Sequence, residues 1–359
     1  MANKHLPHDL AQLQSLPLEA KIIMTQQRIR QWYEYWDGQV YVSFSGGKDS
    51  TVLKHIVDGM YDDVPALFVN TGLEYPEIQK FAMSQKNVVT VRPQMRFDEV
   101  IKKYGYPVIS KEVSNTVAGA RRNIKKGQYS LRLRQLGVKK DEYGGLNDEG
   151  KYDYEKTVKK SKFLQTKWRF LIDADFDMSE KCCNSMKKEP SKKYEKETGR
   201  KPFVGTLACE SMTRAAAWMK KGCNAFEGKR PTSQPLSFWT EQDILHYIKK
   251  YNVPYCSVYG DIVIDDTDDV QVNLIDYLGC YEEGDKLKTT GCDRTGCIFC
   301  MFGCHLEKEP NRFQRLKETH PRQYEYCIGG GEMVDGKWQP SKEGLGLGKV
   351  LDYIGVKYD

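Results

Sequence analysis

Residues 43–51 read Ser-Phe-Ser-Gly-Gly-Lys-Asp-Ser-Thr and follow the apolar run Gln39–Val42. Two adjacent glycines directly after a strand let the backbone curl with its N–H groups pointing inward. Asp49-Ser50-Thr51 suits the first turn of a helix, whose positive end then faces an anion. Glycine and lysine stand too close together for the Walker A pattern GxxxxGK[ST]. We therefore expect another kind of phosphate-binding turn, with these ligand-holding residues: Ser45, Gly46, Gly47, Lys48, Asp49 and Ser50.

Apolar periodicity around this turn predicts alternating strands and helices. The expected strands are Val40–Phe44, Ala66–Asn70, Val88–Val91 and one within 201–206. The expected helices are Pro17–Trp36, Asp49–Asp58, Pro76–Ser84 and Phe97–Tyr104. Such alternation favours an α/β fold, a parallel twisted sheet with helices on both faces, whose ligands gather at the carboxyl ends of the strands.

Two strings in this region resemble a known family. SGGKDS, residues 45–50, resembles the PP-loop of the ATP-pyrophosphatase superfamily. FVNTGLEYPE, residues 68–77, resembles the second nucleotide-contacting loop of the phosphoadenosine phosphosulfate (PAPS) reductase family. The resemblance implies an adenine nucleotide alpha hydrolase-like fold, an adenine nucleotide as ligand, and contacts to it from Asn70, Thr71 and Gly72.

Two later strings extend the resemblance. GTLACESMTR, residues 205–214, is similar to the GxRxxES…R segment of PAPS reductases, which makes Arg214 a second candidate clamp for the anion. Leu207 stands where that family often has arginine, so one expected positive charge is missing. The segment 235–245 resembles the family's PL..W...D helix entry, and Thr240 with Asp243 explains it locally as a capping arrangement.

The chain has 359 residues and a net charge of +6, without an apolar run long enough to span a bilayer. We expect a cytoplasmic protein with no membrane contact. Residues 111–170 hold 16 Lys and Arg against 7 Asp and Glu, so this segment either binds a polyanion such as nucleic acid or the phosphates of a small nucleotide, or is a solvated helix-and-loop insertion. Its basic cluster comprises Arg121, Arg122, Lys125, Lys126, Arg132, Arg134, Lys139 and Lys140. We expect an N-terminal helical segment over 1–37, a PP-loop domain over 38–260 with a basic insertion over about 111–200, and a Cys-rich region over 261–359. Residues 127–201 show weak periodicity, which indicates an insertion rather than core.

The cysteines form two groups. A Cys-Cys pair at 182–183 and a CxxC at 297–300 together resemble the ligands of the [4Fe-4S] cluster in adenylylsulfate (APS) reductases. The resemblance implies a cluster on Cys182, Cys183, Cys297 and Cys300. Zinc is the alternative metal, because Cys₄ zinc sites also use CxxC.

A second ligand set is also open, because GCDRTGCIFCMFGCHLE, residues 291–307, carries four cysteines. They are Cys292, Cys297, Cys300 and Cys304. With the first ligand set, Cys304 beside His305 is a candidate reactive thiolate, since a cationic neighbour lowers a thiol pKa. The alternative is that Cys292 and Cys304 only fill space near the metal.

PAPS reductases use a cysteine in a C-terminal ECGLH-like segment, and residues 350–359 contain none. Two reactions are therefore open: reduction of an adenosine phosphosulfate by a thiolate from Cys304 or Cys327, with a thiol reductant protein as partner, or ATP-dependent adenylation. Adenylation, with Mg²⁺ and a sulfur donor, would serve tRNA thiolation or DNA phosphorothioation. A third hypothesis is a non-catalytic nucleotide-binding protein. The candidate catalytic residues are Lys48, Asp49, Arg214 and Cys304.

Overall fold

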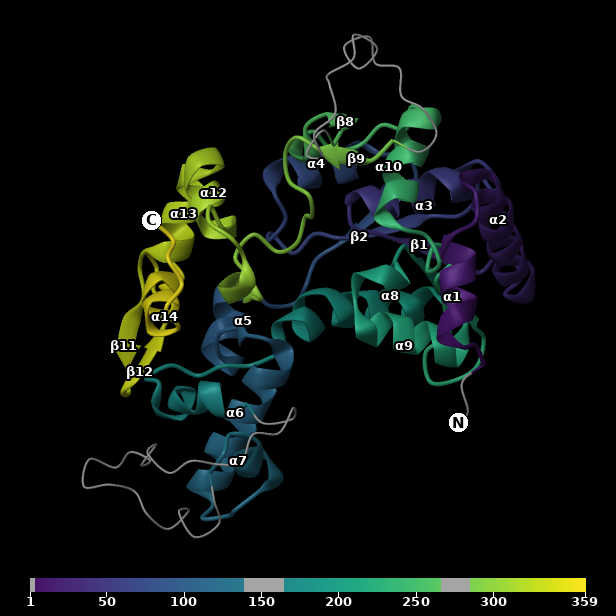
Figure 1. Cartoon of the computed structure of the whole chain (residues 1–359). Helices are drawn as coiled ribbons and strands as arrows, with labels where there is room; N and C mark the ends of the chain where they lie inside the picture. Colours follow the sequence, from purple (N-terminus) through teal and green to yellow (C-terminus); the bar gives the residue numbers. More distant parts are fainter. Residues whose placement is uncertain (1–3, 139–164, 266–284) are drawn as a thin grey trace. The chain divides into compact units, whose positions relative to one another are not determined.

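The computed structural model describes residues 4–138, 165–265 and 285–359, which form two compact units (Figure 1). Unit 1 comprises residues 1–70, 74–92 and 190–296, and unit 2 comprises residues 71–73, 93–189 and 297–359. Each unit is therefore assembled from separate stretches of the chain. The domain boundaries expected from the sequence, at residues 38 and 261, stay a prediction.

Unit 1 is built on a six-stranded sheet with the order β3-β2-β1-β5-β7-β6. Its strands are β1 (Val40–Phe44), β2 (Ala66–Val69), β3 (Val88–Val91), β5 (Lys201–Val204), β6 (Asn224–Ala225) and β7 (Thr232–Ser233). Only the β6–β7 pair is antiparallel within this sheet. The expected, mostly parallel α/β sheet is confirmed.

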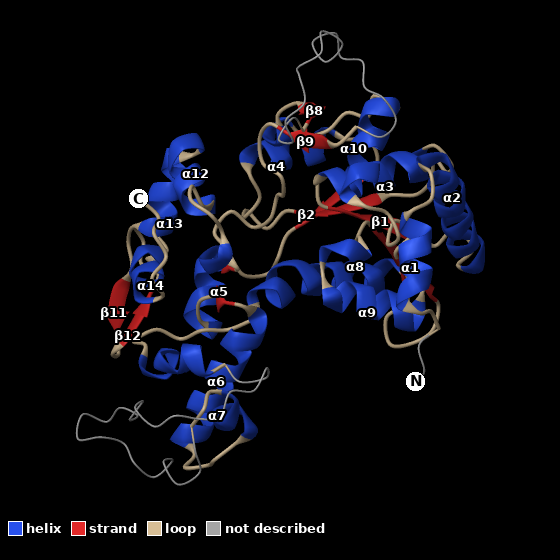
Figure 2. Cartoon of the chain, viewed as in Figure 1, coloured by secondary structure: helices blue, strands red, loops and turns tan. Residues whose placement is uncertain are grey.

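Helices cover both faces of this sheet (Figure 2). The helices of unit 1 are α1 (Pro7–Gln14), α2 (Leu18–Tyr35), α3 (Lys48–Asp58), α4 (Pro76–Ser84), α8 (Glu189–Thr198), α9 (Met212–Lys221) and α10 (Glu241–Lys250). Successive side chains of a strand point to opposite faces. Accordingly, Val42 of β1 lies in the core cluster that contains Val52 of α3, whereas its neighbour Tyr41 packs with Tyr194 of α8.

β1 lies where the strand order reverses, because the chain adds β2 and β3 on one side of it and β5 on the other. In open parallel sheets a ligand crevice forms at such a switch point, beyond the carboxyl ends of the strands. Val42 of β1 pairs with Ala66 on one side and with Phe203 on the other, so the ends of β1 and β5 are neighbours. The turn after β1 is thereby brought next to the loop after β5.

Four of the elements expected from the sequence have the predicted bounds: β1, β3, α4 and α5 (Phe97–Tyr104). Helix α3 begins one residue earlier than predicted, at Lys48. The predicted cap of α10 is confirmed: Asp243 N–H donates to Thr240 Oγ1 at 3.2 Å, and Thr240 N–H donates to Asp243 Oδ2 at 2.6 Å. Asp243 also pairs with the buried ammonium of Lys21 at 2.7 Å, so it fixes α10 to α2 as well.

Unit 2 contains short elements. They are α5 (Phe97–Tyr104), β4 (Val108–Ile109), α6 (Lys111–Lys125), α7 (Leu131–Gln135), the 3₁₀ helix Thr166–Asp173, the π-helical turn Asn184–Lys188, β10 (Met301–Phe302), the 3₁₀ helix Cys304–Leu306, α12 (Arg312–Thr319), α13 (Pro321–Ile328), β11 (Glu332–Val334), β12 (Lys337–Gln339) and α14 (Leu347–Tyr353). β4 pairs with β10 in parallel, and Tyr106, just before β4, bridges to Met178. The residues around positions 178 and 301 thus both lie beside the segment 106–109.

The prediction that residues 127–201 stand outside a core is wrong for part of that range. Leu171, Phe176, Met178 and Met186 are at most 2% exposed. Their turns are short and irregular, so apolar residues enter the interior singly and leave no period of 2 or 3.6 in the sequence.

The basic cluster is likewise not one solvated face. Arg121 donates hydrogen bonds to the carbonyls of Leu171, Ala174 and Phe176 at 2.6–2.7 Å, so it serves the interior of unit 2. Arg132 donates to Asn115 O at 3.0 Å. Lys139 and Lys140 lie outside the described residues. Nucleic-acid binding by this segment stays a prediction.

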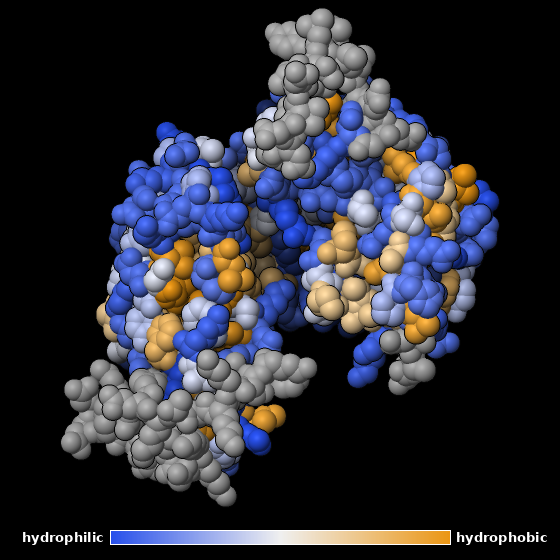
Figure 3. All heavy atoms as spheres, viewed as in Figure 1, coloured by the Kyte–Doolittle hydropathy of each residue, from blue (hydrophilic) through white to orange (hydrophobic). Residues whose placement is uncertain are grey.

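None of the described helices is long and apolar enough to cross a membrane. On the face shown in Figure 3, hydrophilic side chains predominate, and separate apolar areas lie among them on each unit. The most exposed large apolar side chains, those of Met212, Leu306 and Leu131, come from three different elements or turns. Apolar residues exposed singly are ordinary for a folded protein.

Candidate functional site

A pocket of about 260 Å³ lies in unit 1 at the carboxyl ends of β1 and β5. It is lined by Ser43, Ser45, Gly47, Lys48, Asp49, Ser50, Val204, Gly205, Thr206, Glu210, Arg214, Tyr259, Arg294 and Thr295. Most of these residues are polar or charged, and both the turn after β1 and the loop after β5 contribute. The pocket therefore suits a small, highly polar ligand.

Glycines allow the close packing around the turn Ser45–Gly47, the PP-loop. Gly46 has φ +74°, a left-handed conformation, and a Cβ there would lie 3.0 Å from Ile78 Cγ2. A Cβ at Gly205 would lie 3.0 Å from the carbonyl oxygen of Asp49. Any larger residue at Gly205 would push the loop after β5 away from the first turn of α3.

Hydrogen bonds within the PP-loop hold it against α3. Ser45 N–H donates to Ser50 Oγ at 3.2 Å, and Gly47 N–H donates to Ser45 Oγ at 3.3 Å. Ser50 Oγ and Thr51 Oγ1 both donate to Gly47 O, at 2.9 and 3.0 Å. The turn is thus ordered by its own side chains, with the N-terminus of α3 facing the pocket.

Lys48 ties the PP-loop to residues 293–295. It is 6% exposed, and its Nζ donates to Asp293 O at 2.5 Å and pairs with Glu241 at 2.8 Å. Its backbone N–H donates to Tyr259 Oη at 3.2 Å, and that hydroxyl lies 2.6 Å from Thr295 Oγ1. Burial raises the pKa of Tyr259 to about 12, so the hydroxyl keeps its proton at neutral pH. The ammonium of Lys48 is therefore fixed in place beside the pocket.

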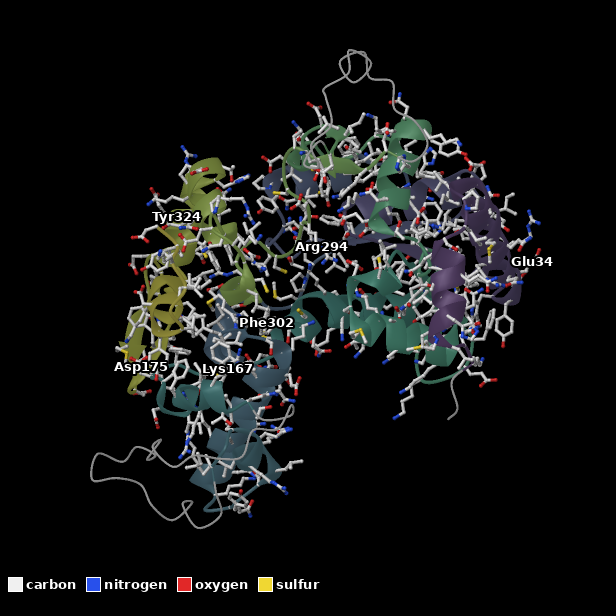
Figure 4. The ribbon with its side chains drawn as sticks, in the orientation of Figure 1. Glu34, Lys167, Asp175, Arg294, Phe302 and Tyr324 are labelled. Atoms are coloured by element: carbon white, nitrogen blue, oxygen red, sulfur yellow. The ribbon has the colours of Figure 1, made fainter. Side chains whose placement is uncertain are left out.

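Two arginines of the pocket share one carboxylate. Glu210 forms ion pairs with Arg214 and with Arg294, one through each oxygen. The side chain of Arg294 is labelled in Figure 4. Ser211 caps α9 by accepting a hydrogen bond from Arg214 N–H at 3.3 Å. The ES…R residues of the sequence motif thus have a structural explanation: the serine starts the helix, and the glutamate orients the arginine.

Two further groups mark the pocket as a polar ligand site. Burial raises the pKa of Asp49, and neighbouring Lys48 partly offsets this shift. Among the described residues, Thr206 Oγ1 is buried and has no hydrogen-bond partner. A buried hydroxyl left unpaired costs free energy, which a bound acceptor would recover.

The structure brings most of the predicted nucleotide residues together. Of the six PP-loop candidates, all except Gly46 line the pocket, and Arg214 joins them. Asn70, Thr71 and Gly72 follow β2, next to β1 in the sheet, but are not among the residues that line this pocket. Their contact with adenosine stays a prediction.

Sequence reasoning missed several lining residues: Thr206, Tyr259, Arg294 and Thr295. Arg294 and Thr295 stand between Cys292 and Cys297, in a stretch interpreted only for its cysteines. The positive charge of Arg294 and the hydroxyl of Thr295 could have indicated an anion-binding role from the sequence. Tyr259 carried none, because its role depends on the loop after α10 folding back to the PP-loop.

Comparisons with known proteins show the family of the chain. The family model described as "Phosphoadenosine phosphosulfate reductase domain" matches residues 39–137 and 140–301. The chain belongs to this family. A curated relative, "Uncharacterized protein MJ0973" of Methanocaldococcus jannaschii, is 32% identical over 96 residues, which are 25% of this chain and 23% of that protein. The chain thus spans about a quarter of that relative's length.

One solved structure that is similar to this PAPS reductase-family chain is the phosphoadenylyl-sulfate (PAPS) reductase from Candida auris in a phosphate complex. The alignment covers 72% of this chain and 92% of that chain, with 13% identity and a TM-score of 0.35.

The four predicted metal ligands of this family member all lie in unit 2. The pairing of β4 with β10 and the bridge from Tyr106 to Met178 bring the segments before Cys182 and after Cys300 to the same short stretch. The Sγ atoms of Cys182 and Cys183 are 4.0 Å apart. Electrostatic interactions join Cys182 to Cys297 and Cys300 as well, so the two cysteine motifs are neighbours.

The donor chemistry of this group fits a thiolate-bound metal, either a [4Fe-4S] cluster or zinc. A hydrogen bond with Cys182 lowers the pKa of Cys183, and Lys111 and Lys187 lower it further. The pKa of Cys182 is raised by the same hydrogen bond and by burial. Within the described ranges, however, no three His, Cys, Asp or Glu side chains stand in a geometry that could hold a metal ion. The cluster and its ligands stay a prediction.

Cys304 differs from the expectation of a reactive thiolate. It is 2% exposed, and its Sγ donates to Met301 O at 3.0 Å. Burial raises its pKa to about 12, and burial also lowers the pKa of His305, which favours the neutral imidazole. The predicted lowering of the Cys304 pKa by a cationic His305 is therefore wrong, because desolvation outweighs any charge from the neighbour.

Proposed function

We propose that the chain binds an adenine nucleotide by its phosphate or sulfate end in the unit 1 pocket and performs sulfur chemistry on the activated group. The observation that carries the proposal is the convergence of the α3 N-terminus, Lys48 and Arg214 on one polar pocket at the switch point of the sheet. Such preorganised donors stabilise anionic groups. The buried hydroxyl of Thr206 supports a bound acceptor at the same place.

Two reactions are compatible with this pocket. In a reductase, a cysteine thiolate would attack the sulfur of an adenosine phosphosulfate, forming a thiosulfonate and releasing the nucleotide through its phosphate oxygen. In an adenylating sulfurtransferase, an acceptor oxygen would attack the α-phosphorus of ATP and release pyrophosphate. A sulfur nucleophile would then displace AMP from the acceptor, which in the tRNA-thiolating or DNA-phosphorothioating type is nucleic acid.

A specific observation favours the adenylating reaction. Cys304 and Cys327 are the two thiols considered for attack on the sulfonate, and they are 2% and 0% exposed. Burial raises the pKa of both thiols. Protonated, enclosed thiols are poor nucleophiles, so a reductase reaction through either one would need the surrounding structure to open.

A metal on Cys182, Cys183, Cys297 and Cys300 is part of the proposal. When bound, an iron–sulfur cluster supplies electron transfer or polarisation of a sulfur-bearing ligand. The chain's own contribution would be four thiols, and the pKa of one of them, Cys183, is lowered. Lys111 and Lys187 would offset part of the negative charge of a thiolate-bound cluster.

The test is anaerobic purification followed by iron, sulfide and zinc analysis, with ATP and PAPS titrations on the same sample, with and without Mg²⁺. About four irons and four sulfides per chain are expected for the cluster type proposed. Binding of ATP with pyrophosphate release would identify the adenylating reaction, and binding of PAPS alone would identify the reductase. If wild-type protein binds neither nucleotide, the proposed function is wrong.

A further inference from the structure

Arg294 has a fixed backbone and an accessible side chain. The residues on both sides are anchored to the pocket wall, Asp293 through its carbonyl to Lys48 Nζ and Thr295 through its hydroxyl to Tyr259 Oη. Gly291 N–H and Cys292 N–H donate to the carbonyls of Tyr259 and Val258, at 2.9 and 3.0 Å. The side chain of Arg294 is nevertheless 61% exposed and lines the pocket. A guanidinium held in this way can meet a ligand at little cost in backbone ordering.

The loop after β5 also carries Leu207, which is 2% exposed and belongs to the apolar core of unit 1. Its backbone N–H donates to Glu210 Oε2 at 3.3 Å. Leu207 therefore supports the position of Glu210 but brings no charge to the pocket.

The Glu210 ion pairs give this wall a defined charge. Oε2 pairs with Arg214 and Oε1 with Arg294, so one carboxylate stands between two guanidinium groups. The local sum is one positive charge, to which the N-terminus of α3, which lines the same pocket, adds. Each guanidinium has five donors in a planar fork, more than one carboxylate oxygen can use. A second anion can thus bind to the pair while Glu210 keeps both arginines in position.

We propose that Arg214 and Arg294 form a two-guanidinium clamp for the anionic tail of the nucleotide. Glu210 is the positioning residue of this clamp. The clamp selects a tail with an anionic group beyond the first phosphate, as in a nucleoside triphosphate or a phosphosulfate. This inference rests on the proposed function, because it assigns the part of the pocket that reads the tail.

The test compares wild-type protein with Arg294→Gln, Arg294→Lys and Arg30→Gln by calorimetric titration with ATP, PAPS and inorganic pyrophosphate. Arg30 is exposed on α2 and does not line the pocket, so its variant controls for net charge. Arg294→Gln should weaken the nucleotide that binds by about 10- to 100-fold, since a hydrogen bond between charged groups contributes this much. Arg294→Lys keeps the positive charge but loses the planar fork of donors, so its nucleotide affinity should lie between those of wild type and Arg294→Gln.

The outcomes separate this inference from the proposed function. If wild type binds a nucleotide and Arg294→Gln binds it within twofold of Arg30→Gln, the clamp is wrong and the proposed function stands. If wild type binds pyrophosphate but no nucleotide, and Arg294→Gln loses pyrophosphate, the clamp stands and the proposed function is wrong. If wild type binds none of the three, both are wrong. Thermal melting of each variant confirms that the fold is intact.

Discussion

The pocket of unit 1 and the cysteine group of unit 2 differ in how they are held. The short stretch of residues 45–50 supplies five pocket residues, and hydrogen bonds within it order the turn. The four cysteines come from two distant segments, and no three of the described metal-binding side chains stand ready for an ion. The comparison indicates that the proposed nucleotide site is held by local hydrogen bonds, whereas a metal would have to complete the proposed cysteine site.

The largest effect is expected for Cys183→Ser, which should abolish the visible absorbance of the proposed cluster and the iron content of the purified protein. Serine cannot replace the thiolate, whose pKa is already lowered by Cys182, Lys111 and Lys187. Nucleotide affinity should stay within twofold, because none of the pocket residues lies in unit 2. Iron analysis and an ATP titration on one preparation check both statements.

Cys304→Ser is the matched control for that experiment and should keep the absorbance. Full iron content in Cys183→Ser would remove Cys183 from the ligand set. Loss of iron in Cys304→Ser would instead favour the alternative set of Cys292, Cys297, Cys300 and Cys304.

A roughly thousandfold effect is expected in the alkylation of Cys304. With a pKa of about 12, this thiol has on the order of a thousandfold less thiolate at pH 8 than an ordinary thiol. The pKa of Cys304 is higher in the folded state than in the unfolded state. The free energy of unfolding therefore keeps its full value below about pH 8.5 and falls as the pH rises toward 12. Iodoacetamide time courses resolved by mass spectrometry measure the rate, with a free cysteine peptide as the reference. Equal rates for Cys304 and that peptide would restore the reactive-thiolate hypothesis.

A roughly hundredfold loss of nucleotide affinity is expected for Lys48→Ala. The variant removes the ammonium beside the PP-loop and also the link to Asp293 O, so residues 293–295 lose an anchor. Iron content should not change, which is the converse of the Cys183 result. Lys220→Ala, at an exposed position of α9, is the control. Unchanged affinity in Lys48→Ala would mean that the lysine only holds the loop together.

Local patterns explain why the PP-loop half of the site was predictable. Gly46, Lys48 and Ser50 act within a few residues of one another, so their spacing alone indicates their roles. Arg294 and Tyr259 enter the same pocket through the return of the chain after α10. No short-range pattern records such a return.

The same limit applied to unit 2. Its buried apolar residues belong to short turns without periodicity, and Cys304 looked reactive because its neighbour in sequence is a histidine. Desolvation of the thiol depends on the packed surroundings and not on the adjacent residue, so only the structure reveals it.

The smallest effect, a two- to tenfold loss of nucleotide affinity, is expected for Thr206→Val. Valine keeps the shape of threonine but removes Oγ1, which is buried without a partner among the described residues. A neutral hydrogen bond is worth about 0.5–1.5 kcal/mol, which sets this range. The ligand-free protein should be as stable as wild type or slightly more stable, because an unpaired hydroxyl is removed from the interior. Calorimetric titration and thermal melting check the two parts, with Thr206→Ser as the variant that retains the hydroxyl. Lower stability with unchanged affinity would show that the hydroxyl serves the protein itself, and the pocket wall after β5 would then owe its ligand contacts to the arginines alone.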